Sequence, residues 1–457
     1  MSQSIAQSLA EFSVALKHTD IPAEVLDKAK SGMLDTIGLC VAAARMDYAD
    51  AVRRLVLQWG GAGEATAIGS SVRVPAQSAA FCNGVLAHGQ DYDETHTEAT
   101  VHGSAALVPS ALAVAESVGA SGSEMLTALI AGSEAAIRIA LPAKNRFHQR
   151  GFHTTSVSTT FGSALIACKL SKMSVEQTAA TLGTCGSVLT GLVECVPAGA
   201  NAKRLHAGWA AHAGIVAAQL AKAGFTGPTT IFDGKYGLYN SMLRGEKLDM
   251  SLVLGGLGTH WDMLDTRPKL YPCCHMLQAY IDCADALRRE HDITPDAIER
   301  IRCRAGQGCA NIVCEPWSTK QNPTTPYSAR FSLPFAVATM FVHGKAGEDE
   351  FSESALHHPM IRALMNKTSY ELEPKYEVKD MSGWVEVELR NGARYCHEVP
   401  VLWGDRARPI PREALLEKFR VNTATLAPKH ATELAEAIEN LETISNVSSL
   451  ATRLAHT

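Results

Sequence analysis

The densest group of side chains able to do chemistry lies in residues 88–102, which read HGQDYDETHTEATVH. This stretch holds the imidazoles of His88 and His102, the carboxyl groups of Asp91 and Asp93, and the hydroxyl of Thr95, with apolar helical sequence on both sides. Imidazoles and carboxylates take up and return protons near neutral pH. We therefore interpret this stretch as a loop that lines a site for acid–base chemistry.

Two other interpretations of the same stretch are open. Its Asp and Thr side chains could cap a helix that begins near Gly103, because these residue types are preferred at helix N-caps. Asp91 and Asp93, with nearby histidines, could instead bind a divalent cation. The sequence offers no second acidic cluster with ligand spacing, so we expect no metal site.

Further candidates precede two predicted helices. His153 stands just before an apolar helical segment, and Lys203 and Arg204 open the helix that ends at Gly224. Cations at the start of a helix oppose its dipole, and an anionic ligand would remove that penalty and use the free N–H groups. The plain alternative is a solvated Lys-Arg pair.

A second basic region follows in the segment RPKLYPCCH, which contains Lys269 and Tyr271, and Arg330 precedes another apolar helix. Such groups suit a carboxylate-binding cleft, with arginine as a bidentate clamp. The whole inventory is typical of proton abstraction next to a carboxylate. Cations would hold the carboxylates and stabilise an aci-carboxylate intermediate, while one side chain takes the proton.

Several function classes are disfavoured by the sequence. It has no GxxxxGK[ST], GxGxxG, HExxH, paired CxxC or GxSxG motif, which argues against nucleotide hydrolysis, Rossmann-type hydride transfer, zinc catalysis and serine hydrolysis. A net charge of −5 argues against nucleic-acid and membrane partners. The N-terminal residues lack a secretory signal, so we expect a cytoplasmic protein whose twelve cysteines are free thiols.

The elements that must position these groups fall into two predicted domains. Residues 1–266 are expected to be helical; the apolar residues from Val25 to Val41 recur every four positions after a helix-starting Pro22. Residues 267–404 are expected to form a smaller α+β domain, in which GWVEVELRNGARYCHEV predicts a β-hairpin. Residues 405–457 are expected to be helical and to pack back on the first domain.

Several sequence blocks, in order, resemble the MmgE/PrpD family over nearly the whole chain. They are LDTIGLCVAAA, AAFCNGVLAHGQDYDET, HGSAALVPSALAVAE, GFHTTSVSTTFGSALIACKL, AKRLHAGWAAHAG, GFTGPTTIFDGKYG and KLYPCCHMLQAYIDC. The family includes 2-methylcitrate dehydratase, cis-aconitate decarboxylase and iminodisuccinate epimerase. The resemblance implies a mostly α fold with a large all-helical domain plus a smaller α+β lid domain. It also implies a homodimer, a small polycarboxylate substrate, and neither a metal nor an organic cofactor.

The resemblance further implies a set of site residues. Carried over residue by residue, the candidate catalytic residues are Asp91, Thr95, His102, His153, Lys203 and Lys269. To these the residue types add the candidate substrate-binding residues His88, Arg204, Tyr271 and Arg330. We expect His153 and His102 to be the proton-transfer pair, with Asp91 orienting one of them. Lys203, Lys269 and Arg330 are expected to bind carboxylates.

Two departures from the family's members bear on the reaction. Phe335 stands where the decarboxylase has an active-site tyrosine, and phenylalanine cannot donate a proton. The tryptophan-bearing loop of the methylcitrate dehydratases is missing after Thr95. We expect a lyase, either a dehydratase or a decarboxylase of a citrate- or aconitate-like acid. The alternatives are an epimerase of an iminodisuccinate-like amino-dicarboxylate, which Phe335 favours, and a non-catalytic carboxylate-binding protein.

Overall fold

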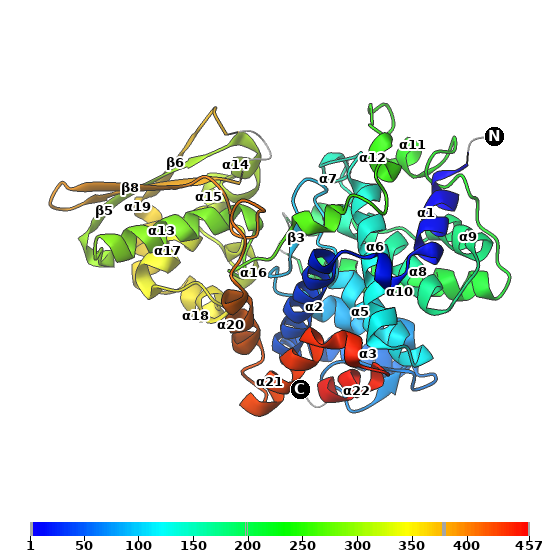
Figure 1. The fold of residues 1–457 in the computed structure, drawn as a ribbon. Coiled ribbons are helices and arrows are strands. Elements are labelled where there is room, and N and C mark those ends of the chain that lie inside the picture. Colours follow the sequence, from blue (N-terminus) through cyan, green and yellow to red (C-terminus); the bar gives the residue numbers. More distant parts are fainter. Residues whose placement is uncertain (1–2, 197, 199, 377–380, 456–457) are drawn as a thin grey trace. The chain divides into compact units, whose positions relative to one another are not determined.

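Long helices make up most of the larger of two units, which consists of Met1–Thr266 together with Pro411–Thr457. The smaller unit, Arg267–Ile410, contains the main β-sheet. The computed structural model describes residues 3–196, 198, 200–376 and 381–455 (Figure 1). The predicted fold class, a mostly α protein with a large helical domain and a smaller α+β domain, is confirmed.

The larger unit is built mainly from helices, with a few two-residue strands between them. Before Thr266 its helices are α1 (Ile5–Ala15), α2 (Ala23–Ala43), α3 (Asp47–Trp59), α4 (Ala76–His88), α5 (Ser104–Val118), α6 (Gly122–Ala140), α7 (Arg146–Gln149), α8 (Thr154–Leu170), α9 (Val175–Cys185), α10 (Ala202–Lys222), α11 (Leu238–Met242) and α12 (Ser251–Leu254). Strands β1 (Ala65–Thr66) and β2 (Arg73–Val74) pair antiparallel, a ribbon that the sequence analysis did not predict.

Helix α2 illustrates how the sequence dictates these elements. Pro22 is its N-cap, where proline's fixed φ and missing N–H cost nothing. The predicted apolar stripe, which includes Val25, Met33 and Val41, is buried in the core of the unit. The predicted helix is therefore confirmed, and it begins directly after Pro22.

Helices α4 and α10, which both carry predicted site residues, approach each other closely at two glycines. A Cβ atom on Gly84 would lie 2.7 Å from the Cα atom of Gly208, and a Cβ atom on Gly208 would lie 2.7 Å from Cγ2 of Val85. Real Cβ atoms do not tolerate such distances, so the backbones can cross this closely only without side chains. The crossing brings the C-terminal part of α4 beside the N-terminal half of α10.

Replacing Gly208 by alanine is expected to lower the free energy of unfolding by about 1–3 kcal/mol, because overpacking forces helix α10 away from α4. Urea unfolding measures this change. The matched control is Gln219→Ala, at an exposed position of the same helix, which should stay within about 0.5 kcal/mol of the wild type. Equal stability of the two variants would mean that the helices do not cross at Gly208.

The smaller unit has a four-stranded sheet in the order β6-β5-β7-β8 (Figure 1). The strands are β5 (Ile298–Ala305), β6 (Thr368–Leu372), β7 (Gly383–Leu389) and β8 (Arg394–Val399), with β5–β6 parallel and the other pairs antiparallel. The predicted hairpin is confirmed: Val385 and Val387 face the core and Gly392 turns with φ 86°.

Some helices of this unit pack on the sheet, and others pack on those helices. They are α13 (Gln278–Glu290), α14 (Gln307–Val313), α15 (Trp317–Lys320), α16 (Pro326–Ala329), α17 (Leu333–His343), α18 (Glu353–Leu356) and α19 (Pro359–Lys367). Helix α13 packs on β7 and β8, α19 packs on β5, and α17 packs against both helices (Figure 1).

After the smaller unit the chain returns to the larger one in helices α20 (Arg412–Asn422), α21 (Pro428–Glu439) and α22 (Ser448–Ala451). Helices α20 and α21 pack on α2, and α22 packs on α5. This returning segment therefore belongs to the same core as helices that precede it by almost the whole chain.

Candidate active site

Four histidines of the larger unit gather around the imidazole of a fifth, His153. Its ring centroid lies 5.0 Å from that of His206, 5.4 Å from His148, 5.5 Å from His88 and 6.3 Å from His102. The rings of His88 and His153 stack, with an interplanar angle of 28°. The structure thus brings together the three histidines that the sequence analysis singled out.

The ends of helices place these rings. His88 is the last residue of α4, His153 is the N-cap of α8, and His206 lies in the first turns of α10. The backbone N–H of His153 donates to the carbonyl of Gly191 at 2.8 Å. Since three separate helices must pack correctly to form the cluster, its geometry depends on the tertiary fold.

Hydrogen bonds fix which nitrogen carries a proton in the rings of His88 and His102. His88 Nδ1 lies 2.7 Å from the carboxylate of Asp93, and His102 Nδ1 lies 2.9 Å from the carbonyl oxygen of Glu94 and 3.1 Å from Thr95 Oγ1. Carboxylate and carbonyl oxygens accept hydrogen bonds, so both Nδ1 atoms donate. In its neutral form each ring then has Nε2 free of a proton and able to accept one.

Two of the Nε2 atoms have no protein partner. Those of His88 and His153 are buried and make no hydrogen bond to any described residue. Buried polar atoms are almost always hydrogen-bonded, and exceptions need an explanation. A substrate group that exchanges a proton with these nitrogens is one explanation.

Burial controls the charge of the central histidines. It lowers the pKa of His153 well below its ordinary value, and electrostatic interactions with the neighbouring histidines, His148 first, and with Lys203 act in the same direction. Burial also lowers the pKa of His206 to about 4, with the charges of His88 and Lys203 contributing. These rings are therefore neutral at pH 7. Their Nδ1 atoms lie 3.0 Å apart, so one donates to the other, and the ring that donates has its Nε2 free to accept a proton.

The lowered pKa of His206 predicts a pH-dependent stability. Its pKa is about 4 in the folded protein and about 6.5 when unfolded, so between these values the unfolded chain binds more protons. The contribution of His206 to stability should fall as pH falls from about 6.5 to 4, by up to about 1.4 kcal/mol per pH unit. Urea unfolding of the wild type and of His206→Gln across this range measures the contribution as their difference. A difference that does not change with pH would contradict the lowered pKa.

A buried ion pair adjoins the cluster. Lys203, in the first turn of α10, donates to the carboxylate of Asp91, and both side chains are almost fully buried. The charge of Lys203 contributes to the lowered pKa of His153, which places the ammonium within electrostatic reach of that ring. Asp91 has φ 53°, a left-handed conformation that is uncommon outside glycine. The backbone is therefore bent at the residue that meets the lysine.

The capping interpretation of the loop is wrong. Helix α5 begins at Ser104 with Gly103 as its N-cap, and no side chain caps it. The carboxyl group of Asp93 and the hydroxyl of Thr95 contact histidines instead. Nor do the described residues contain a group of three or more His, Cys, Asp or Glu side chains arranged to hold a metal ion.

Arg204 lies beside the site and makes contacts within the protein. Its Nε donates to the carbonyl of Gly89 at 2.8 Å, another of its nitrogens donates to Asn201, and its guanidinium lies 4.2 Å from the ring centroid of Tyr48. These contacts hold the start of the loop against α10. Substrate binding by Arg204 stays a prediction.

The predicted site residues of the smaller unit are also buried, or they form hydrogen bonds or ion pairs within the protein. Lys269 is 1% exposed, and the hydroxyl of Tyr271 donates to Asp282 at 2.9 Å. Burial, with Asp282 contributing, raises the pKa of Tyr271 above its ordinary value. Arg330 forms an ion pair with Glu348. Their roles in binding carboxylates stay predictions.

Phe335, the departure from the decarboxylase pattern, lies in α17 in the core of the smaller unit. It is fully buried, and its ring centroid lies 5.6 Å from that of Phe351. Its surroundings are those of a core residue, and its side chain has no group that could transfer a proton.

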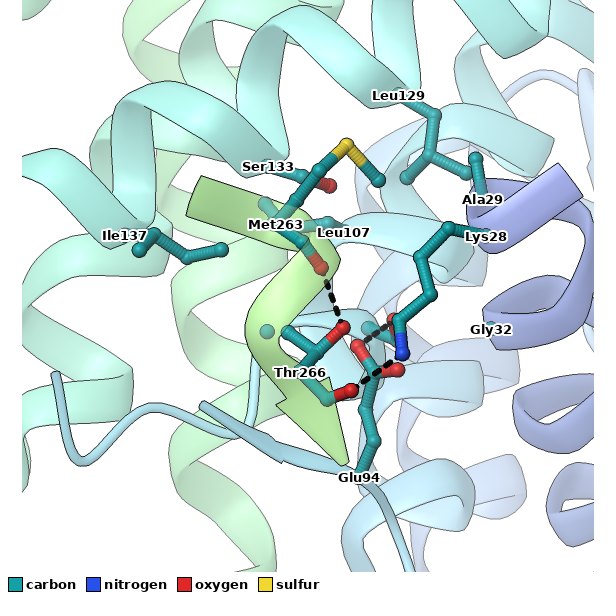
Figure 2. A pocket seen from close by; sticks show the side chains of 12 residues that line it. Lys28, Ala29, Gly32, Glu94, Leu107, Leu129, Ser133, Ile137, Met263 and Thr266 are labelled. Atoms are coloured by element: carbon teal, nitrogen blue, oxygen red, sulfur yellow. Dashed lines mark hydrogen bonds between the residues drawn. The ribbon is translucent and has the colours of Figure 1, made fainter. Parts of the chain in front are cut away.

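Sequence reasoning passed over Glu94, His148 and His206. Glu94 lines a small cavity of about 20 Å³. Figure 2 shows its carboxyl group beside the amino group of Lys28. That amino group donates a hydrogen bond to the backbone carbonyl of Thr266. Burial raises the pKa of Glu94. His206 had a usable signal, because it follows Lys203 by three residues and so shares its helix face. His148 had none, since only the tertiary fold brings it to His153.

Comparisons with known proteins agree with this architecture. The MmgE/PrpD N-terminal domain matches residues 7–251, and the MmgE/PrpD C-terminal domain matches residues 271–443. The chain belongs to the MmgE/PrpD family, as the sequence blocks predicted, and it is an enzyme of that family.

Curated relatives extend over the full length of the chain. It is 27% identical to the cis-aconitate decarboxylase of Homo sapiens, over 99% of this chain and 95% of the relative. It is 25% identical to the cis-aconitate decarboxylase-like protein oryM of Aspergillus oryzae, over 98% and 96%. The cis-aconitate decarboxylase of Aspergillus terreus is 22% identical, over 98% and 95%.

In the described part of the chain, each helix is too short or too polar to cross a bilayer.

Proposed function

We propose that the chain is a cofactor-independent lyase that acts on a small citrate- or aconitate-like acid by proton transfer through side chains. The observation that carries this proposal is the pair of buried, unpartnered Nε2 atoms of His88 and His153, in stacked rings beside the Asp91–Lys203 ion pair. The curated relatives named as cis-aconitate decarboxylases support decarboxylation as the first reaction to test.

The proposed decarboxylation balances with one proton. In a β,γ-unsaturated acid such as cis-aconitate, the bond to the leaving carboxylate breaks and its electron pair forms a new C=C bond. The electron pair of the original C=C bond takes a proton from an acid of the enzyme, and carbon dioxide leaves. Positive charge near the remaining carboxylates stabilises the negative charge that develops between these steps.

The side chains of the larger unit fit these tasks. His153 and His102 form the proposed proton-transfer pair, in which the neutral His153 accepts the proton that dehydration removes and His102 is the proposed acid that supplies the proton for decarboxylation. His88, held by Asp93, stacks on His153. Lys203 supplies positive charge, and Asp91 holds its ammonium in place. In the alternative dehydration, the same groups remove a proton next to a carboxylate and protonate the departing hydroxide to give water.

A second candidate, epimerisation of an amino-dicarboxylate, is favoured by Phe335. A residue without a proton-transferring group stands where the decarboxylase pattern has tyrosine. An epimerase removes the proton on one face of the carbon and returns a proton on the other, so it loses neither water nor carbon dioxide.

Proton NMR of the purified enzyme in D₂O separates these reactions. Cis-aconitate, 2-methylcitrate, citrate and iminodisuccinate are supplied one at a time. New vinyl signals, with loss of carbon dioxide or water, would establish the lyase and name its substrate. Deuterium entering an α-carbon without loss of either would establish the epimerase. Binding without any exchange of substrate protons would contradict both.

A further inference from the structure

A lysine from the returning C-terminal segment contacts the centre of the site loop. Lys418, on α20, donates from Nζ to the backbone carbonyl of Tyr92 at 2.9 Å, and the same ammonium lies 3.8 Å from the centroid of the Tyr92 ring. It also lies 2.5 Å from Oδ1 of Asp35 on α2. Lys418, Asp35 and Tyr92 are each less than a tenth exposed.

Two of the three contacts are with Tyr92, which lies in a segment that carries two site residues. Tyr92 stands between Asp91, which binds Lys203, and Asp93, which binds His88. The two aspartates must therefore reach different partners from positions two residues apart on one bent backbone. The left-handed φ of Asp91 is of a kind that costs free energy and persists only where surrounding contacts fix it.

Stability alone is a poor explanation for this lysine. Removing two charges from water costs several kcal/mol per ion, and replacing a buried ion pair by apolar residues is often neutral or stabilising. A lysine that only had to fill space between α20 and α2 could be methionine. An ammonium group is needed where a backbone carbonyl, an aromatic face and a carboxylate must be held at one point.

We propose that Lys418 is a positioning residue for catalysis, which holds Tyr92 so that Asp91 reaches Lys203 and Asp93 reaches His88. Asp35 balances its charge and orients the ammonium. The proposal rests on the proposed function only in treating these two aspartates as parts of the catalytic site. The returning segment then positions catalytic side chains in addition to packing on α2.

Three variants separate positioning from stability. Lys418→Met removes the ammonium but leaves Asp35 as an uncompensated buried carboxylate, so it should lower both stability and turnover. The double variant Asp35→Asn, Lys418→Met removes both charges and should recover most of the stability. Glu116→Gln is the control, because it neutralises a different buried carboxylate. This carboxylate accepts hydrogen bonds from Thr66 and contacts none of the site residues described above.

Turnover is measured with whichever acid the NMR assay identifies, and stability by urea unfolding. In the double variant we expect kcat to stay at least tenfold below that of the wild type, while KM changes less than threefold. Its stability should equal that of Glu116→Gln. We expect Glu116→Gln to keep its kcat within about twofold. A double variant that regains both stability and kcat would overturn the proposal, because Lys418 would then be only structural.

A readout without turnover distinguishes failure of this proposal from failure of the proposed function. The proton on Nδ1 of His88, shared with Asp93, gives a downfield NMR signal, which can be assigned by its loss in Asp93→Asn. This signal should shift or broaden in the double variant and stay unchanged in Glu116→Gln. An unchanged signal in the double variant overturns the positioning role even if no acid is turned over. A wild type that turns over none of the four acids, with the signal shifted in the double variant, contradicts the proposed function alone.

Discussion

Replacing His153 by glutamine is expected to lower turnover by about 10²–10⁴-fold, the usual contribution of a positioned general acid–base group. Its ring is the centre of the histidine cluster, and burial keeps its pKa well below the ordinary value, so that it is neutral and can accept a proton at pH 7. Glutamine keeps polar atoms of similar reach but cannot exchange a proton. Steady-state rates with the acid identified by NMR measure the loss.

His148→Gln is the matched control for this prediction. His148 contacts the same ring edge-on, at 5.4 Å between centroids, and its burial also lowers its pKa, to about 4. Its Nδ1 lies 2.8 Å from the hydroxyl of Thr154, as the Nδ1 of His153 lies 3.0 Å from that of His206. The two rings differ at Nε2, since only that of His153 is among the buried atoms without a hydrogen-bond partner. We expect its loss to reduce turnover less than tenfold. Equal losses in the two variants would assign the effect to disturbance of the cluster rather than to proton transfer by His153.

The parts of this architecture that follow from local patterns could be predicted from the sequence. Helix α2 follows from its four-residue apolar repeat and Pro22, and the β7–β8 hairpin follows from alternating residues around Asn391-Gly392. The ribbon of β1 and β2 is only two residues per strand, too short for any alternation to register.

The candidate site was predictable only as far as neighbours along the chain are neighbours in space. His88 and His102 lie at the two ends of one loop, and their residue types were enough to predict them as site residues. The contact of Asp91 with Lys203 spans more than a hundred residues and depends on the glycine crossing of α4 and α10. Lys418 is more distant still, and its own surroundings in sequence, LLEKFRVN, carry no sign of a catalytic role.

Breaking the Asp91–Lys203 pair is expected to cost both stability and turnover. Lys203→Met leaves a carboxylate buried in the bent loop without its ammonium, and removing one partner of a buried ion pair costs about 3–5 kcal/mol of unfolding free energy. The same change removes the positive charge that would hold a substrate carboxylate, so turnover should fall by at least about 10²-fold, comparable to the loss of one transition-state donor. Urea unfolding and steady-state kinetics measure the two losses on the same preparation.

The two losses have different causes, and a second substitution separates them. In the double variant Asp91→Asn, Lys203→Met no uncompensated charge remains, so most of the lost stability should return. Turnover should not return, because the ammonium is still missing from the histidine cluster. Turnover of the double variant is compared with that of Lys203→Arg. Arginine keeps the positive charge but spreads it over a planar group, which must fit a site built around a compact ammonium. Full activity in the double variant would mean that Lys203 serves only to neutralise Asp91, and the cation that binds substrate would then have to be sought elsewhere in the chain.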